Sequence, residues 1–270
     1  MKVASLHIHP VKAMRAVDLT RAKLETRGLE NDRRWMVIDA AGNFMTQRKR
    51  PLLATIAARI TENGLSLSVD GGGVLDVARP DAARRRDVVV WDSTVSAACA
   101  APPASAFLSD ILGEEAHLVF MDDEARRMKD SMWTPSPEPV SFADAFPVLV
   151  TSTGSLAALN RDIEAHGGAA VPMARFRPNI VVDCDEDWPE DNWRRLKIGG
   201  VELDLVKPCD RCIVTTTDQR SGARMGPEPI ASLARIHRST DPRIKGVIFG
   251  MNAAPRALGD IAVGDSVEAS

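Results

Sequence analysis

The first half of the chain alternates short apolar runs with turn residues. The turn Ala41-Gly42-Asn43 separates the apolar run 35–38 from Phe44, Met45 and Thr46, which is typical of a β-hairpin. Apolar runs predict strands at 3–8, 35–38, 53–60, 65–69, 88–91 and 118–121. Regular short strands separated by turns favour a barrel or sandwich over a doubly wound sheet.

Helical spacing of apolar residues occurs in only a few places. Residues 104–112 predict a helix that Gly113 ends, and residues 229–236 predict another. Leu156, Leu159 and Ile163 recur at helical spacing directly after a predicted strand. Residues 122–139 are polar and proline-bearing without periodicity, so we expect a long loop or a linker between two halves. Further strands are predicted at 146–150, 180–182, 201–205, 213–214, 246–251 and 259–265.

Composition narrows the class of protein. At 270 residues the chain is long enough for one large domain or two small ones. The formal net charge is only −3, so we expect binding neither to nucleic acid nor to an acidic membrane. Four cysteines do not form a disulfide framework, which fits a reducing compartment. No secretory signal and no segment of membrane-spanning length is visible, so we expect a soluble, cytoplasmic protein.

Chemistry-bearing residues concentrate in the segment 207–218. Cys209 and Cys212 flank Arg211 at the point where one predicted strand ends and another begins. A thiolate in such a loop can ligate a soft metal, attack an electrophile or cycle through a disulfide. The cation of Arg211 favours the thiolate form of either sulfur and could also bind an anion.

A C-x-x-C motif alone leaves several interpretations open. Structural zinc needs clustered ligands, but Cys99 and Cys184 are isolated and no histidine has ligand spacing. A thioredoxin-like pair normally opens a helix, whereas the β-branched run 213–217 favours a strand. Two inert buried thiols are a further alternative, because free cysteine often packs as a small hydrophobe.

Two further segments have the residue types of an anion site. Ser152 and Ser155 lie at the predicted start of a helix, where hydroxyls either cap the helix or help to bind an anion. Arg175 and Arg177 precede Asn179 at the beginning of a strand, where they can pair with surface carboxylates or bind a phosphate. The residues by themselves leave both pairs of alternatives open.

Together these segments resemble the MOSC family, which is named for the C-terminal domain of molybdenum cofactor sulfurases. The resemblance is closer to its amidoxime-reducing branch, which includes the mitochondrial amidoxime-reducing component and bacterial YcbX-type proteins. It covers nearly the whole chain, and the order and separation of the matching pieces make it specific. The pieces are His9-Pro10-Val11-Lys12, 32–39, Pro51, 142–144, 155–160, 176–180, 209–218 and 263–265.

The resemblance implies a β-rich α+β fold with few helices. A MOSC-type β-barrel domain, residues 123–270, would pack against an N-terminal β-barrel-like domain, residues 1–122. It further implies a molybdenum cofactor (Mo-molybdopterin), with Cys212 as the catalytic thiolate and the metal ligand, and no ligand role for Cys209. Soft thiolate ligation suits such a metal. The other cofactor-binding positions implied are Lys12, Arg33, Ser152, Ser155, Arg177, Asn179, Asp210 and Arg211.

The resemblance also implies a molybdenum-dependent oxidoreductase that reduces N-hydroxylated compounds such as amidoximes, hydroxylamines and N-hydroxylated bases, without pyridoxal phosphate. The chain has neither the cysteine spacing of a plant-type iron–sulfur cluster nor a dinucleotide fingerprint. We therefore expect electrons from a separate reductase, flavoprotein or iron–sulfur carrier. The alternative is a sulfur carrier or cofactor-binding module without its own turnover. Candidates for a general acid are Asp210, Asp218 and His237, on sequence proximity alone.

Two departures from the family pattern matter. Ala13 stands where reference members of the branch carry a hydroxyl beside the lysine, so one hydrogen bond to the cofactor would have to come from elsewhere. The chain also has no length for a sulfurase domain, which is the feature that would favour the carrier alternative.

Overall fold

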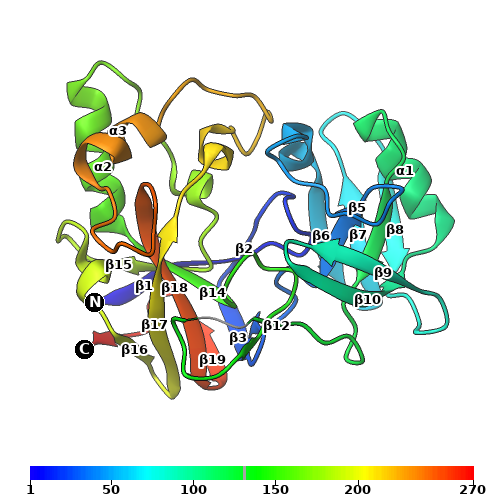
Figure 1. Cartoon of the computed structure of the whole chain (residues 1–270), viewed down its shortest axis with the longest axis horizontal. Helices are drawn as coiled ribbons and strands as arrows, with labels where there is room; N and C mark the ends of the chain where they lie inside the picture. The colour runs from blue at the N-terminus through cyan, green and yellow to red at the C-terminus, as the bar shows by residue number, and fades with distance from the viewer. Residues whose placement is uncertain (130–131) are drawn as a thin grey trace.

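The strands form two lobes that lie side by side in this computed structural model, which describes residues 1–129 and 132–270 (Figure 1). The first lobe is built on an eight-stranded sheet in which only the β14–β15 pair is parallel. Its strands are, in spatial order, β2 (Val17–Leu19), β1 (Lys2–Ile8), β15 (Ile180–Asp183), β14 (Val148–Ser152), β18 (Ile248–Ala257), β17 (Val201–Asp210), β16 (Arg195–Ile198) and β20 (Val267–Ala269). A second sheet consists of β19 (Gly259–Ala262), β3 (Arg21–Glu25) and β4 (Gly28–Leu29).

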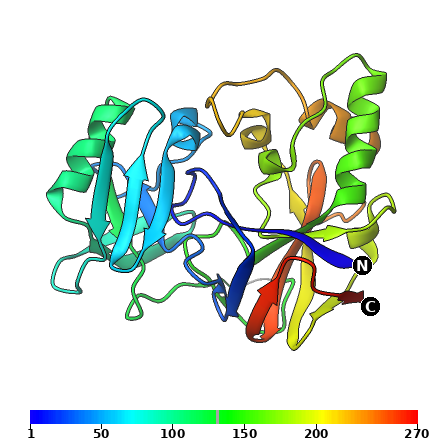
Figure 2. The same cartoon turned by 180° about the vertical axis from the view of Figure 1, so that it is seen from behind.

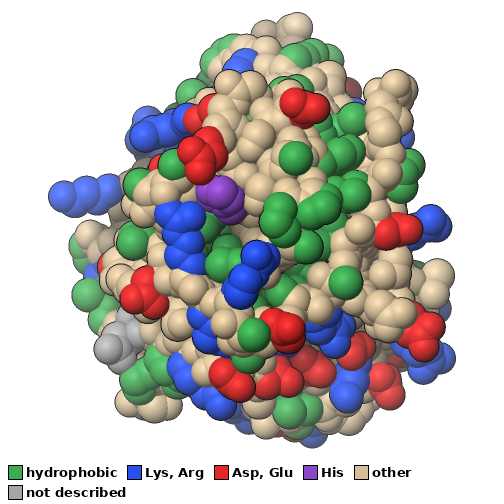
Figure 3. Space-filling view, turned by 90° about the vertical axis from the view of Figure 1, so that its right-hand side faces the viewer, with side chains coloured by type: hydrophobic (Ala, Val, Ile, Leu, Met, Phe, Trp, Pro, Cys, Tyr) green, Lys and Arg blue, Asp and Glu red, His purple; other side chains and the backbone are tan. Residues whose placement is uncertain are grey.

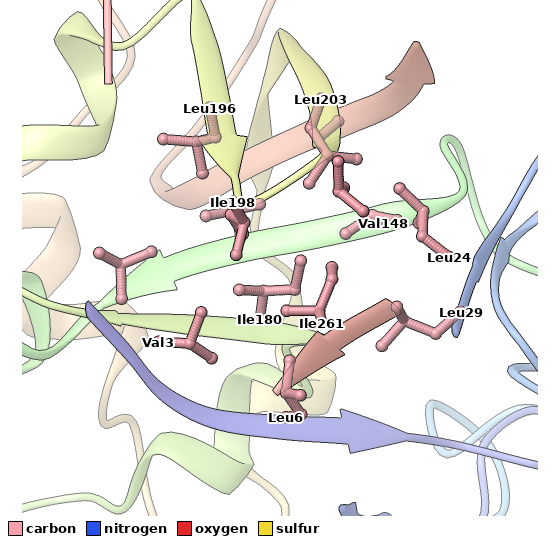
Figure 4. Packing of buried hydrophobic residues seen from close by; sticks show 14 of the residues in the cluster. Val3, Leu6, Leu24, Leu29, Val148, Ile180, Leu196, Ile198, Leu203 and Ile261 are labelled. Carbon is pink, nitrogen blue, oxygen red and sulfur yellow. The ribbon is translucent and has the colours of Figure 1, made fainter. Parts of the chain in front are cut away.

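The core of the first lobe lies between these two sheets. Successive side chains of a strand point to opposite faces, so Val201 and Leu203 point into the core while Glu202 between them does not. Figure 4 shows Leu6, Ile180 and Ile261 meeting from three different strands. Burial of these apolar side chains is the main force that holds the sheets together.

The second lobe has two smaller sheets and one helix (Figure 2). One sheet contains β5 (Trp35–Ile38), β11 (His117–Phe120), β10 (Ser93–Cys99) and β9 (Arg85–Val90), and the other contains β6 (Ala57–Thr61), β7 (Gly64–Ser68) and β8 (Val74–Ala78). The helix α1 (Pro102–Leu112) packs its buried Ala104 and Leu108 into the same core. Seen from the right-hand side of Figure 1, the surface mixes basic and acidic side chains around a group of hydrophobic ones (Figure 3).

The chain does not fill the lobes in sequence order. Strands β1 to β4 belong to the first lobe although they precede the whole second lobe. The chain therefore crosses between the lobes near residues 10–15 and 30–34, and returns before β14. A division of the sequence at residue 122 stays a prediction, since residues 2–29 pair with strands from the end of the chain.

Helices are few, and they lie mainly on the first lobe. The α-helices of the first lobe are α2 (Thr153–Ala165) and α3 (Ile230–Ile236). The 3-10 helices in the described residues of both lobes are η1 (Pro51–Thr55), η2 (Met173–Phe176), η3 (Pro189–Asn192) and η4 (Ile213–Thr216). The expected β-rich α+β fold with few helices is confirmed. Among the described residues, no helix is both long and apolar enough to cross a membrane.

Several expected elements are confirmed and others need correction. The predicted helix 104–112 is α1, and Gly113 ends it in the left-handed conformation with φ of 69°. Residues 213–214 are not a strand, because the amide and hydroxyl of Thr215 both bond to the carbonyl of Cys212 and close the turn of η4. Residues 53–55 are helical rather than extended, because Pro51 starts η1; the predicted strand begins only at β6.

Two further corrections concern turns and loops. The predicted second hairpin strand at Phe44 is reduced to isolated bridges, one of them with Ile38. The segment 122–139 is not wholly irregular, because β12 (Met128–Lys129) pairs antiparallel with β13 (Glu138–Pro139). Residues 130 and 131 of that segment lie outside the described residues.

Candidate functional site

A pocket of about 1060 Å³ is lined by residues of both lobes. Strand β17 and the loop after it supply one wall, while the crossings of the chain between the lobes supply another. The pocket brings together seven of the sequence-predicted site residues, namely Lys12, Arg33, Arg177, Asn179, Asp210, Arg211 and Cys212. Ser152 and Ser155 are not among its lining residues.

Arg211 holds the cysteine loop, residues 209–212, in place. Its guanidinium donates to the carbonyl of Phe249 at 2.6 and 2.9 Å and to that of Phe176 at 3.1 Å. The two phenyl rings stack with centroids 3.7 Å apart, and the guanidinium lies over both. Arg211 therefore fixes the backbone that presents Cys212, while still adding positive charge to the pocket.

The two cysteines of the loop differ in how they are placed. Cys212 follows the end of β17 and precedes η4, so its side chain lies at a bend of the chain. Cys209 lies within β17, and burial raises the pKa of its thiol, which Arg211 only partly offsets. A raised thiol pKa favours the neutral form of Cys209, which also lines the pocket.

Asp210 is tied to a neighbouring cation. Lys207 donates to its carboxylate at 2.6 Å. Burial alone would raise the pKa of Asp210, but the hydrogen bond and charge of Lys207 hold it below its ordinary value. An ionised carboxylate cannot donate a proton, so the geometry argues against Asp210 as a general acid.

The other two candidate acids are placed away from the pocket. Asp218 accepts from the amides of Arg220 and Ser221 and so shapes its own turn. His237 bonds to Asp191 at 2.7 Å and stacks on a tryptophan ring. Neither Asp218 nor His237 lines the pocket, and Asp210, which does line it, is held ionised by Lys207.

Arg177 and Arg33 form the cationic centre of the opposite wall. Arg177 donates through Nη1 to the carbonyl of Met14 at 2.7 Å and to Gln219 at 2.9 Å, but its Nη2 is buried without a partner. Arg33 donates to Asp32, to Asn179 and to the carbonyl of Arg177. Asp32 pairs directly with Arg33, while Arg177 only senses the charges of Asp32 and Asp144.

The electrostatics of this pair favour the binding of an anion. Burial, then the nearby charge of Arg33, lower the pKa of Arg177 to about 9. The guanidinium stays protonated at neutral pH. Because its pKa is lowered, the protein stabilises this cation less well than water does. A buried donor without a partner is costly, and a charged ligand oxygen would satisfy it. An anionic group such as a phosphate fits this wall.

Backbone conformation singles out the same place. Four of the six non-glycine residues with positive φ in the described chain line the pocket, namely Ala13, Arg33, Trp91 and Arg177. Left-handed backbone is unfavourable for residues with a side chain and persists where the surrounding structure requires it. Such strain concentrates at functional sites, which makes this pocket the leading candidate in the described chain.

Asn179 joins the crossings of the chain to the sheet. Its side-chain oxygen accepts from the amide of Leu149 at 3.1 Å and from Arg33 at 3.2 Å, and its amide nitrogen donates to the carbonyl of His7 at 3.1 Å. Asn179 therefore positions Arg33 as much as it could position a ligand.

Lys12 lies on the pocket floor with two partners that sequence reasoning missed. Its ammonium group donates to Asp144 and, at 2.7 Å, to the carbonyl of Phe142. Asp144 also accepts from the indole of Trp91 at 2.9 Å. The segment 142–144 was part of the family resemblance, so it was the signal that could have identified Asp144; no sequence signal identified Trp91.

The protonation of this pair follows from its surroundings. Burial lowers the pKa of Lys12, although Asp144 raises it again in part. Burial would raise the pKa of Asp144, but Lys12, the indole of Trp91 and Arg33 together hold it well below the ordinary value. Asp144 is therefore ionised at neutral pH, and 70% of its side-chain surface is exposed.

Ser152 and Ser155 do not line the pocket, and their hydroxyls face the carboxylate of Glu190. Ser152 caps α2 by accepting from the amide of Ser155 at 3.1 Å. Both hydroxyls donate to Oε2 of Glu190 at 2.7 Å, inside the protein. The start of α2 is already capped by Ser152 and occupied by the carboxylate of Glu190. Of the two interpretations of the sequence, capping therefore describes this helix start.

The described residues offer few side chains that could ligate a metal ion. Among residues 1–129 and 132–270, no group of three or more His, Cys, Asp or Glu side chains is placed to hold a metal ion. A metal at Cys212 would need most of its ligands from elsewhere, as a cofactor that brings its own sulfurs provides. The soft thiol of Cys212 beside an unsatisfied cationic wall fits a molybdopterin with its phosphate.

Comparison with known proteins agrees with this geometry. Residues 1–115 match the model of the MOSC N-terminal beta barrel domain, and residues 137–268 match the model of the MOSC domain. The chain is 31% identical to mitochondrial amidoxime-reducing component 1 of Homo sapiens over 98% of this chain and 82% of that protein. It is 29% identical to mitochondrial amidoxime reducing component 2 of Rattus norvegicus, with the same coverage, and 30% identical to component 1 of Xenopus laevis over 98% and 81%.

These matches span both lobes and, between them, contain both walls of the pocket. The relatives carry the word mitochondrial in their names, so the expected cytoplasmic location of this chain stays a prediction. With an N-terminal beta barrel domain, a MOSC domain and relatives that it matches over almost its whole length, the chain belongs to the MOSC family of amidoxime-reducing components.

Proposed function

We propose that this protein is a molybdenum-cofactor-dependent reductase of N-hydroxylated compounds that takes its electrons from a separate protein. The observation that carries the proposal is one pocket in which Cys212 shares the space with the buried, unpartnered Nη2 of Arg177. The names of the relatives support amidoximes as the substrate class.

The residues present fit such a cofactor. Cys212 would ligate the metal, and Arg177, with Arg33 beside it, would bind the phosphate of the pterin. Lys12 would add a further positive charge at the pocket floor. When bound, the cofactor supplies the two-electron reduction of the N–O bond.

The chain's own residues position the groups that would bind the cofactor, and they offset the positive charge of the pocket. Arg211 keeps the cysteine loop in place through carbonyl contacts, and Asn179 orients Arg33. Asp144 and Asp210 are held ionised, so protons for the reaction do not originate from them at neutral pH. Their negative charge offsets the cations on both walls, which limits self-repulsion before an anion binds.

The decisive experiment compares Cys212→Ser with Cys209→Ser. Protein purified from a host that makes the cofactor is analysed for molybdenum and for pterin, and benzamidoxime reduction is followed with reduced viologen as the donor. We expect Cys212→Ser to lose bound molybdenum and turnover, and Cys209→Ser to keep most of both. Equal losses in the two variants would favour a two-thiol site instead.

The same measurements address the alternative of a carrier module. A carrier would hold the cofactor at full occupancy and yet reduce no N-hydroxylated compound with any artificial donor. Parent protein without molybdenum after expression in a competent host would contradict both functions.

A further inference from the structure

Exposed apolar side chains lie on the two segments of the chain that meet beside the cysteine loop. Leu52, Ile213 and Met225 expose 43%, 54% and 58% of their surfaces. Ile213 directly follows Cys212, and the amide of Met225 donates to the carbonyl of Thr216 in the same turn of chain. Exposed apolar side chains gathered at one place mark an interaction site more often than a free surface.

These side chains lie on a bridge between the lobes. Arg224 donates to the carbonyls of Ile213 at 2.9 Å, Gln47 at 3.1 Å and Arg48 at 3.0 Å. Gly222 is so close to Pro51 that an added Cβ would lie 3.1 Å from its carbonyl oxygen. In Figures 1 and 2, η1 and the segment after β17 approach each other across the lobes.

The rim of this bridge is positively charged. Arg48, Lys49 and Arg220 are exposed, and none of them has a carboxylate oxygen within 4.0 Å among the described residues. The protein as a whole has a net charge of −3, so this concentration of unpaired cations is local. An apolar centre with a charged rim is the usual composition of a protein-binding surface, and the charge selects a partner of opposite sign.

We infer that this bridge surface, made of the three apolar residues and the three rim cations, docks a small acidic redox protein that delivers electrons to the pocket. The inference rests on the proposed function, because only a reductase without its own reduced nicotinamide site needs such a partner. Reducing an N–OH group to N–H breaks the N–O bond, consumes two electrons and two protons, and releases one water. The donor supplies the electrons, and water supplies the protons.

The location suits electron delivery. The apolar residue Ile213 is the chain neighbour of Cys212, and Arg48 and Lys49 line the pocket itself. A donor seated on the bridge would therefore lie next to the residue that is proposed to ligate the metal. Steering by the rim cations would raise the rate of encounter at low ionic strength.

The test uses flavodoxin, a small acidic flavin carrier, as the probe. The test variant is the triple substitution Leu52→Glu, Arg220→Glu and Met225→Glu, none of which lines the pocket. The control carries the same three kinds of charge change at Arg21, Leu258 and Val263, which lie in or beside β3 and β19, away from the bridge (Figure 1). Binding of oxidised flavodoxin is measured by calorimetry, and turnover is measured with reduced flavodoxin and separately with reduced viologen.

We expect the parent protein to bind flavodoxin with an affinity that falls as salt rises, since exposed charges are screened. The bridge variant should bind at least about tenfold more weakly, and its flavodoxin-driven rate should fall with it, whereas the control should match the parent. Viologen-driven turnover should be equal in all three. Parent-like binding by the bridge variant, or an equal loss in the control, would overturn the inference.

The outcomes separate this inference from the proposed function. If viologen drives no turnover in the parent, the proposed function fails, and the binding comparison still decides whether the bridge is a docking surface. If the bridge variant loses viologen-driven turnover as well, these residues support the pocket and not a partner, and the docking inference is wrong.

Discussion

Two regions of the first lobe have groups that could bind an anion, and they differ in what their polar atoms already contact. At Arg177 a buried guanidinium nitrogen has no partner, and Arg33 adds a second positive charge beside it. At the start of α2, the hydroxyls of Ser152 and Ser155 already donate to the buried carboxylate of Glu190. An anion site is therefore recognised by donors that remain unsatisfied, and the number of donors alone does not identify it.

The largest effect should come from removing the unsatisfied cation. Arg177→Ala should lower molybdenum and pterin content at least about tenfold, because truncating one partner of a buried charge pair costs about 2–5 kcal/mol. Ser155→Ala, at the satisfied site, should leave the cofactor content unchanged. Metal analysis and pterin fluorescence of the purified proteins measure both.

The folding of each variant provides the control for that comparison. Far-UV circular dichroism should show a folded Arg177→Ala protein, because the lost contacts of Arg177 are one carbonyl and one glutamine oxygen. Full cofactor content in Arg177→Ala would remove the distinction between the two regions. Equal loss in Ser155→Ala would mean that the start of α2 does contact the cofactor.

The same distinction explains what the sequence could predict. Strand and helix patterns located most elements, since alternating apolar residues such as Val201 and Leu203 record which face is buried. They failed at η4, where hydrogen bonding by Thr215 overrides the strand preference of its β-branched neighbours. They also gave no indication that β1 would pair with β15, a contact between distant parts of the chain.

The motifs named residues that the fold brings into one pocket, whereas partners that come from elsewhere in the chain could not be read from the sequence. Cys212, Arg177 and Lys12 meet in one pocket although 200 positions separate the first from the last. The two serines lie outside the pocket lining, and a sequence does not show that Glu190 will reach the start of α2. Trp91 was missed because its role depends on a left-handed backbone with φ of 57° and a contact across the fold.

A second prediction concerns Asp144, whose carboxylate lies in the pocket lining. Asp144→Asn should lower the free energy of unfolding by about 1–3 kcal/mol at pH 7, because it leaves Lys12 buried without its ion pair. The effect should stay below that of a fully buried pair, since most of the Asp144 side chain is exposed. Urea unfolding of the cofactor-free proteins measures the difference.

The pH dependence of that difference has a defined sign. The pKa of Asp144 is lower in the folded state, so its contribution is present above the ordinary aspartate pKa of about 3.9 and is lost as the pH falls further. Parent and Asp144→Asn should therefore converge in stability towards low pH. The control Trp91→Phe, which removes only one hydrogen bond to Asp144, should cost about 1 kcal/mol or less.

The smallest effect should come from the start of α2, where both serine hydroxyls already donate to Glu190, and its pH dependence should have the opposite sign. Burial raises the pKa of Glu190, although the two serine hydroxyls oppose the change. The folded protein then binds a proton more readily than the unfolded chain, so stability declines as the pH rises above the ordinary glutamate value of about 4.3. Glu190→Gln removes this titration, and its stability relative to the parent should improve between pH 5 and pH 8 by on the order of 1 kcal/mol. A constant difference across that range, measured by urea unfolding, would show that Glu190 is ionised in the fold at pH 5 and that its two serines offset its burial completely.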